Sequence, residues 1–183
     1  MSIHIERYGR VASLLHWLVG LALLLQIAFG FLLDEIAPRG TPSRASVINL
    51  HKSLGIALAV LIVLRLAWRL RHRAPVWPVS MSAWQRRAAR IGHAALYGCM
   101  IAMPVSGYLG SNFSKHGIKL FGLALRPWGP DLPAVYAAFN LLHVATAWAF
   151  TALIAGHVLL AVKHVIVDRE RLFARVSPWA TPH

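Results

Sequence analysis

Four long apolar runs restrict what this chain can fold into. They lie at about residues 11–33, 46–68, 89–110 and 138–167. Each is close to or above the roughly 20 residues that a helix needs to cross about 30 Å of hydrocarbon. In lipid the backbone polar groups must be satisfied internally, and a helix does this within one segment. The sequence therefore predicts an all-α membrane protein, a bundle of four transmembrane helices that forms one domain over residues 1–183.

The composition agrees with a membrane protein and excludes other classes. Of the 183 residues, 57% are hydrophobic and 14% are charged, whereas about a quarter of a soluble domain is charged. Disorder needs low hydrophobicity, and a disulfide scaffold needs more than the 1 cysteine present. The net charge is +13, but the basic residues stand between apolar runs rather than on a charge-rich face. We therefore expect membrane lipid, and no nucleic acid, as a partner.

The distribution of lysine and arginine predicts the orientation, because cytoplasmic loops carry an excess of both. Thirteen lie on the side that holds both termini and the loop after the second run, and six lie on the other side. Both termini should therefore be cytoplasmic in a multi-pass membrane protein, which in a bacterium would lie in the inner membrane. The loops at 34–45 and 111–137 should be periplasmic, and their prolines and glycines predict ordered turns or short interfacial segments. The six outer cations are Arg39, Arg44, Lys52, Lys115, Lys119 and Arg126.

Histidine is the ionisable residue that recurs inside the apolar runs, where such side chains are costly and usually functional. His16 lies in the first run, His51 in the second, and His143 and His157 in the fourth. The last two are 14 residues apart, which on a helix places them on nearly one face and about 21 Å apart along the axis. One face of the fourth helix then holds two sites, one in each leaflet.

Depth in the membrane pairs these histidines. His51 and His143 each follow the outer start of their helix, and His16 and His157 lie toward the cytoplasmic side. The inner pair is mismatched by a few ångströms, which helix tilt could absorb. Facing imidazoles in an apolar bundle suit haem iron, whereas zinc needs four ligands. The chain has no C-x-x-C-H motif, so the expected cofactors are two non-covalent b haems.

Each histidine has an alternative role, because polar side chains in membrane helices also form hydrogen bonds between helices; the paired depths favour iron binding. His93 and His164 are further inner candidates, which we expect to surround the haem or meet the interface. Cations are expected to pair with haem propionates, and their alternative role is snorkelling at the membrane surface. Among these cations we select Lys52 on the outer side and Arg69 on the inner side. The other inner candidates are Arg7, Arg65 and Arg90.

A set of short motifs resembles the bacterial cytochrome b561 family over almost the whole chain. The motifs are E-R-Y-G at 6–9, L-L-H-W-L at 14–18, L-H-K-S-L-G-I at 50–56, R-L-A-W-R at 65–69, R-I-G-H-A-A-L-Y at 90–97, P-V-S-G-Y at 104–108 and the histidines at 143 and 157. That family is similar to the cytochrome b subunits of nickel-iron hydrogenases and formate dehydrogenases. The resemblance implies a four-helix bundle with two b haems, whose axial iron ligands are His16, His51, His143 and His157.

The resemblance also implies electron transfer between a donor and ubiquinone or a related quinone. Lys52, Ser53 and residues 111–119 are places where a quinone headgroup could bind. Some members of the family oxidise superoxide at the periplasmic face, and Lys52, Lys115 and Lys119 would attract a small anion. Three functions remain open: a quinone-linked oxidoreductase that acts alone, such as a superoxide:quinone oxidoreductase; a cytochrome b anchor subunit of a larger hydrogenase or dehydrogenase complex; and a non-redox anchor or transporter.

Overall fold

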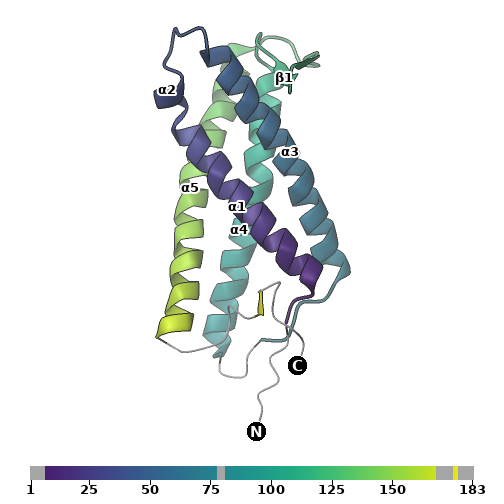
Figure 1. The fold of residues 1–183 in the computed structure, drawn as a ribbon, viewed down its shortest axis with the longest axis vertical. Coiled ribbons are helices and arrows are strands. Elements are labelled where there is room, and N and C mark those ends of the chain that lie inside the picture. The colour runs from purple at the N-terminus through teal and green to yellow at the C-terminus, as the bar shows by residue number, and fades with distance from the viewer. Residues whose placement is uncertain (1–6, 78–80, 168–174, 177–183) are drawn as a thin grey trace.

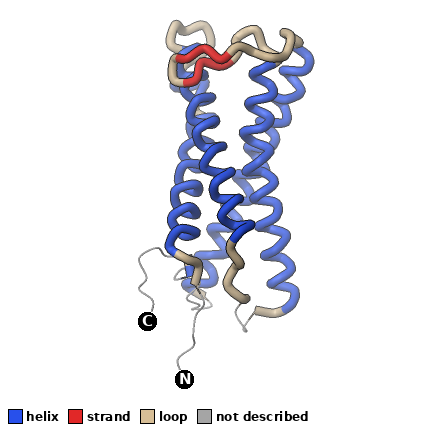
Figure 2. Tube along the Cα trace, turned by 90° about the vertical axis from the view of Figure 1, so that its right-hand side faces the viewer, coloured by secondary structure: helices blue, strands red, loops and turns tan. Residues whose placement is uncertain are grey.

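Four long helices run side by side in the computed structural model of the chain (Figure 1). The structure describes residues 7–77, 81–167 and 175–176. Figure 2 shows from a second direction that the strands and longer loops gather at one end of the bundle. The helices are α1 (Arg10–Phe31), the single turn α2 (Leu33–Ile36), α3 (Arg44–Arg71), α4 (Ala83–Asn112) and α5 (Pro133–Ile166).

α3 and α4 extend past their apolar runs at both ends and α5 extends past its run at the start, whereas α1 ends two residues before its run does. α4 begins at Ala83 because Ser82 forms a capping box with Gln85, in which each side chain bonds the other's backbone N–H, at 3.3 and 2.7 Å. α5 begins with Pro133 in its first turn, where a missing N–H costs nothing. The apolar runs therefore give the approximate length of each helix, while the capping box sets the start of α4 and Pro133 stands at the start of α5.

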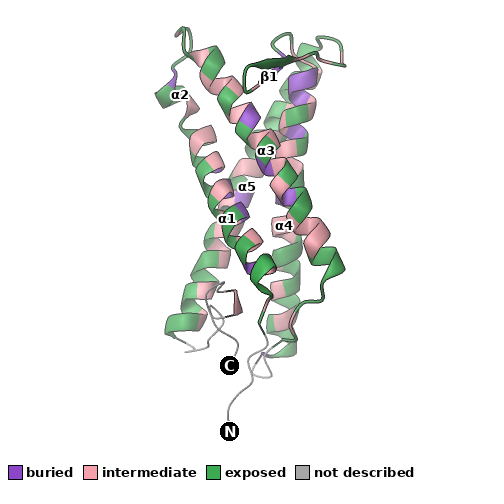
Figure 3. Ribbon diagram, turned by 45° about the vertical axis from the view of Figure 1, so that its right-hand side comes forward, coloured by how far each residue is buried: buried purple, intermediate pink, exposed green. Residues whose placement is uncertain are grey.

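Three helices are long and apolar enough to cross a membrane, namely α1, α3 and α5. Large apolar side chains such as Leu21, Leu25 and Leu159 are exposed on them, which suits lipid and not water. In Figure 3 most of the outward-facing surface of the helices is exposed or intermediate. α4 has 30 residues but is less apolar than the other three and is not among these spans. The expectation of four spans is thus supported for three helices.

The long helices pack as two pairs, α1 with α3 and α4 with α5. The most extensive helix contact between the pairs is that of α3 with α4. A buried apolar core lies among all four helices; Phe150 on α5 and Val19 on α1 are each only 1% exposed. The other buried members are Leu23, Ile27, Leu58, Ile62 and Met100.

A hairpin in the 111–137 loop is a regular element that the sequence did not predict. Strand β1 (Ile118–Leu120) pairs antiparallel with β2 (Leu123–Leu125). The two residues of the turn, Phe121 and Gly122, have φ values of 46° and 96°. Positive φ at both positions matches the twist of a two-residue hairpin. Phenylalanine rarely adopts such a φ, so the sequence carries no signal for this turn.

The 34–45 loop is fixed by Arg44 at the start of α3. Its Nη1 donates to the carbonyl oxygens of Ala37, at 2.6 Å, and Leu33, at 3.3 Å, and it pairs with the Asp34 carboxylate at 2.5 Å. These bonds satisfy carbonyl groups at the end of α2, which a helix leaves without partners. The loop is therefore an ordered turn, as its prolines and glycine indicated.

The chain segments before α1 and after α5 meet at the end of the bundle opposite the hairpin. The Tyr8 N–H donates to the Arg175 carbonyl at 3.0 Å, and Trp17 Nε1 donates to the Val176 carbonyl at 2.9 Å. Both segments therefore lie on one side, as the charge distribution predicts. The terminal residues themselves, 1–6 and 177–183, lie outside the described residues.

Candidate functional site

His51 of α3 and His143 of α5 face each other toward the hairpin end of the bundle, and we call them the outer pair. Their ring centroids are 6.3 Å apart and the ring planes are 89° to each other. His143 Nδ1 lies 3.0 Å from the Met103 carbonyl oxygen and 3.2 Å from Ser106 Oγ. An Nδ1–H that donates to a carbonyl leaves Nε2 with a free lone pair, as in metal-binding histidines.

Gln26 and two glycines complete the surroundings of the outer pair. Gln26 Nε2, on α1, donates to the His51 carbonyl at 2.7 Å and lies 3.2 Å from His51 Nδ1. A Cβ at Gly30 would lie 3.2 Å from His51 Cε1, and one at Gly107 would lie 3.1 Å from His143 Cε1. The glycines thus let the rings lie against the backbones of α1 and α4. Sequence reasoning missed all three residues, because only the packing of the helices brings them to the histidines.

His16 of α1 and His157 of α5 form the inner pair. Their ring centroids are also 6.3 Å apart, with the planes at 63°. His93 of α4 lies on another side of His157, at 5.5 Å between centroids. The structure therefore brings together both predicted pairs and adds His93 to the inner one. Among the residues that the structure describes, no three histidine, cysteine or acidic side chains are arranged to bind a bare metal ion.

Arg65, one of the inner cations named from the sequence, contacts the inner pair. Its Nη2 lies 3.1 Å from His16 Nδ1, and its guanidinium carbon is 6.0 Å from the centre of the Tyr97 ring. Within the described residues its Nε is buried and has no hydrogen-bond partner. The four long helices contain no aspartate or glutamate. A buried guanidinium is stabilised by an anion, so this site suits the carboxylate of a bound group.

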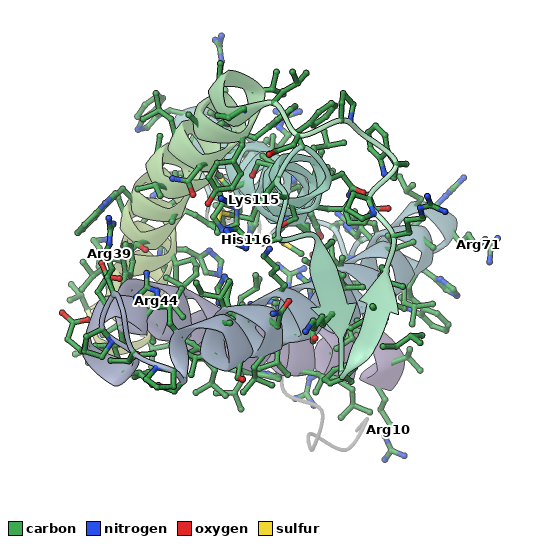
Figure 4. All side chains as sticks on the ribbon, turned by 90° about the horizontal axis from the view of Figure 1, so that it is seen from above. Arg10, Arg39, Arg44, Arg71, Lys115 and His116 are labelled. Atoms are coloured by element: carbon green, nitrogen blue, oxygen red, sulfur yellow. The ribbon has the colours of Figure 1, made fainter. Side chains whose placement is uncertain are left out.

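Lys52 contacts the hairpin, and Arg69 is an exposed residue of α3. Lys52 Nζ donates to the Gly117 carbonyl oxygen at 2.7 Å, which ties it to the hairpin. Arg69 is exposed, one turn beyond Arg65 on α3. Their pairing with propionates stays a prediction. Seen from the hairpin end in Figure 4, Lys115 and His116 lie over the bundle, whereas Arg39 lies at its edge.

The two sites are separated by the apolar core. Phe150 lies on α5 seven residues after His143 and seven before His157, which is about 10 Å along the axis from each. Its side chain is 1% exposed and packs within the cluster of buried apolar residues. The fold therefore holds two polar centres at different depths with a packed apolar layer between them.

Both imidazole pairs fit the axial ligation of haem. Metal–imidazole bonds are about 2 Å long and the ring centre is about 1 Å further, so two axial rings have centroids roughly 6 Å apart. The observed separation is 6.3 Å in each pair. A haem with its propionates requires imidazoles in an apolar surround and a nearby cation, and Arg65 is such a cation, with no acidic partner among the residues that the structure describes.

Comparison with known proteins is consistent with this chemistry. Residues 7–179 match the family model described as prokaryotic cytochrome b561. The chain belongs to this family. Cytochrome b561 homolog 2 of Escherichia coli K12 is 33% identical over 179 residues, which cover 93% of this chain and 91% of the relative. Cytochrome b561 homolog 1 of the same strain is 25% identical over 176 residues, covering 94% and 98%.

A third relative of this b561-family protein is named as a probable superoxide oxidase, from Yersinia pestis. It is 28% identical over 179 residues, covering 94% of this chain and 97% of the relative. The resemblance stated from the motifs is thus confirmed. The protein is a prokaryotic b-type membrane cytochrome, and its family implies haem b.

Proposed function

We propose that this b561-family protein is a dihaem cytochrome that transfers single electrons between a donor and a membrane quinone such as ubiquinone. The observation that carries the proposal is the pair of imidazole sites, each with 6.3 Å between ring centroids, about 21 Å apart along α5. When bound, each haem b supplies an iron centre that takes up and releases one electron.

At the outer site, His51 and His143 would hold the iron from α3 and α5. The contact between His143 Nδ1 and the Met103 carbonyl, at 3.0 Å, fixes the ring orientation and directs Nε2 away from that carbonyl. Ser106 adds a second contact on the same nitrogen, at 3.2 Å. These bonds pre-orient one of the two ligands.

At the inner site, His16 and His157 would hold the iron from α1 and α5. A neutral imidazole that binds metal through Nε2 carries its proton on Nδ1. His16 Nδ1 then cannot accept from Arg65, whose Nη2 lies 3.1 Å away. Arg65 is thereby released to pair with an acidic group of the cofactor.

We further propose that all four long helices span the bacterial inner membrane as one domain, with both termini in the cytoplasm. α4 supports this because it packs along α5. The bond between Tyr8 and Arg175, at 3.0 Å, supports a common side for the terminal segments. The hairpin is then periplasmic.

Superoxide is the donor that we propose for the outer side. The relative named as a probable superoxide oxidase supports this donor, as do Lys115 and Lys119 near the hairpin, since both attract anions. Two superoxide anions lose one electron each and become O₂, and one quinone takes up both electrons and two protons to become quinol. The alternative function is a cytochrome b anchor for a hydrogenase or dehydrogenase complex, whose partner subunits would deliver the electrons.

The decisive test is a pyridine haemochrome assay on the purified chain. Two haem b per chain, with low-spin six-coordinate spectra, are expected, and one haem or none would contradict the proposal. Adding superoxide and a soluble quinone should then reduce the quinone, with two superoxide consumed per quinol. A haem-containing chain that reduces quinone only with copurified dehydrogenase subunits would instead support the anchor function.

A further inference from the structure

Ser53 joins α3 to the hairpin through a buried hydroxyl. Its side chain is 1% exposed. Ser53 Oγ accepts a hydrogen bond from the Phe121 N–H at 2.9 Å. Its single proton faces two carbonyl oxygens, that of Asn49 in the same helix at 2.8 Å and that of Lys119 in the hairpin at 3.1 Å. One turn earlier on α3, Asn49 Oδ1 accepts from the Lys119 N–H at 2.9 Å. Two side chains of α3 thus accept hydrogen bonds from two backbone N–H groups of the hairpin.

These bonds stabilise a strained turn. Phe121 has a φ of 46°, a conformation that bulky residues avoid. Its side chain is 66% exposed, so burial of the phenylalanine does not explain the strain. Such backbone persists where the surroundings over-determine it, and it is frequent at functional sites. Here the surroundings are the hydroxyl of Ser53 and the fixed register of the two strands.

The same part of α3 carries one half of the outer pair. His51 lies between Asn49 and Ser53 in the sequence, and the neighbouring Lys52 adds a third link through its bond to Gly117, at 2.7 Å. The chain enters the hairpin from α4 and leaves it toward α5, and α5 holds His143. The hairpin therefore connects the helix that presents one imidazole with the helix pair that presents the other.

We propose that Ser53 and Asn49 are positioning residues for the outer haem site, because their bonds to the hairpin fix the distance of His51 from His143. The proposal rests on the haem sites of the proposed function. The inner pair lies on the other side of the apolar core, so its geometry does not depend on the hairpin. Loss of the Ser53 hydroxyl should therefore weaken haem binding at one site and not at the other.

The test compares two buried serines in the haem-loaded protein. Ser53→Ala removes the hydroxyl that bonds the hairpin. Ser111→Ala is the matched control, because Ser111 is 4% exposed and its Oγ donates within its own helix to Gly107, at 2.8 Å. The measurement is the rate at which each haem transfers to apomyoglobin, with the outer haem assigned from the spectrum of His51→Ala.

The Ser53→Ala protein should lose the outer haem about tenfold faster than the unsubstituted protein, since the Phe121 N–H is left without its bond. Its inner haem should be lost at an unchanged rate. Ser53→Thr, which keeps a hydroxyl, should restore slow loss. Asn49→Ala should also speed loss of the outer haem, and it serves as the test if Ser53→Ala does not fold. Equal rates for the Ser53→Ala and Ser111→Ala proteins would overturn the proposal, as would equal acceleration for both haems. If His51→Ala retains two low-spin haems, the proposed function itself is wrong.

Discussion

At the scale of single residues, the four paired imidazoles differ in what their Nδ1 atoms contact. His143 Nδ1 faces a carbonyl acceptor at 3.0 Å, whereas His16 Nδ1 faces the donor Arg65 at 3.1 Å. His51 Nδ1 faces the amide nitrogen of Gln26 at 3.2 Å. In the proposed haem-bound state, Nδ1 would carry a proton while Nε2 binds iron, and His143 has the contact that this state requires. The contacts of Arg65 and Gln26 with their histidines would then have to change.

Single alanine substitutions test the pairing. His51→Ala and His143→Ala should each abolish the same outer haem, because an iron left with one imidazole loses affinity and its low-spin state. His16→Ala and His157→Ala should abolish the inner haem in the same way. His93→Ala and His164→Ala should keep two low-spin haems with at most a shifted potential. Optical redox titration measures this, and His116→Ala, an exposed histidine at the hairpin end, is the control.

The assignment of His157, and not His164, to the inner haem needs a test of its own. His164 lies seven residues beyond His157, and so on the same face of α5. Loss of the inner haem in His164→Ala, with retention in His157→Ala, would show that the pairing is wrong by two turns.

Gly107→Ala tests the close contact of α4 with the outer pair. The added Cβ would lie 3.1 Å from His143 Cε1, so the ring must shift, at a cost of about 1–3 kcal/mol for overpacking. The outer haem should dissociate at least several-fold faster, while the inner haem is retained. Gly20→Ala, where nothing lies within 4 Å of the new Cβ, should change neither rate. The measurement is the rate of haem transfer to apomyoglobin for both variants. Identical rates would contradict a close contact between Gly107 and His143.

At the scale of elements, the sequence predicted what depends on periodicity and depth. The 14-residue spacing on α5 and the distances of His16 and His51 from their helix starts were enough to pair the rings. The hairpin was missed because Phe121 gives no turn signal, and Gln26 because its contact with His51 arises only when α1 packs on α3. The apolar run at 89–110 predicted a membrane span, but α4 is less apolar than the other three long helices and is not among the candidate spans.

Insertion of one alanine after Thr151 tests whether α5 is one continuous support for both sites. The insertion rotates one half of the helix relative to the other by about 100° and moves it by about 1.5 Å. His143 and His157 then cannot both face their partners, so one haem should be lost and one kept. Thr151→Ala, which removes a bond to Ala147 within the same helix, at 2.8 Å, but preserves the register, should keep both. Haem counting by pyridine haemochrome distinguishes these outcomes.

At the scale of the whole molecule, the arrangement is two helix pairs joined at several levels. The hairpin connects them at one end, and the apolar core connects them in the middle. Each predicted haem would bridge the pairs, because one ligand comes from α1 or α3 and the other from α5. The cofactors would therefore add to stability by binding only the assembled bundle.

The orientation is tested by labelling in intact cells with a membrane-impermeant maleimide. In a Cys99→Ala background, a cysteine at His116 should react from outside, because we propose that the hairpin end is periplasmic. A cysteine at Arg73, in the loop between α3 and α4, should react only after permeabilisation. Both positions are exposed in the structure. The reverse pattern would invert the topology, and the superoxide donor would then have to approach from the cytoplasm.

The position of Phe150 on α5 has a mechanical consequence. The helix carries one ligand of each predicted site at equal distances on either side of this buried side chain, which is held in the core. Because close packing in the core holds α5 at this midpoint, a displacement at one end of the helix is resisted before it reaches the other end. The midpoint therefore acts as a mechanical barrier, and each site can be altered by its own neighbours without a change at the second site.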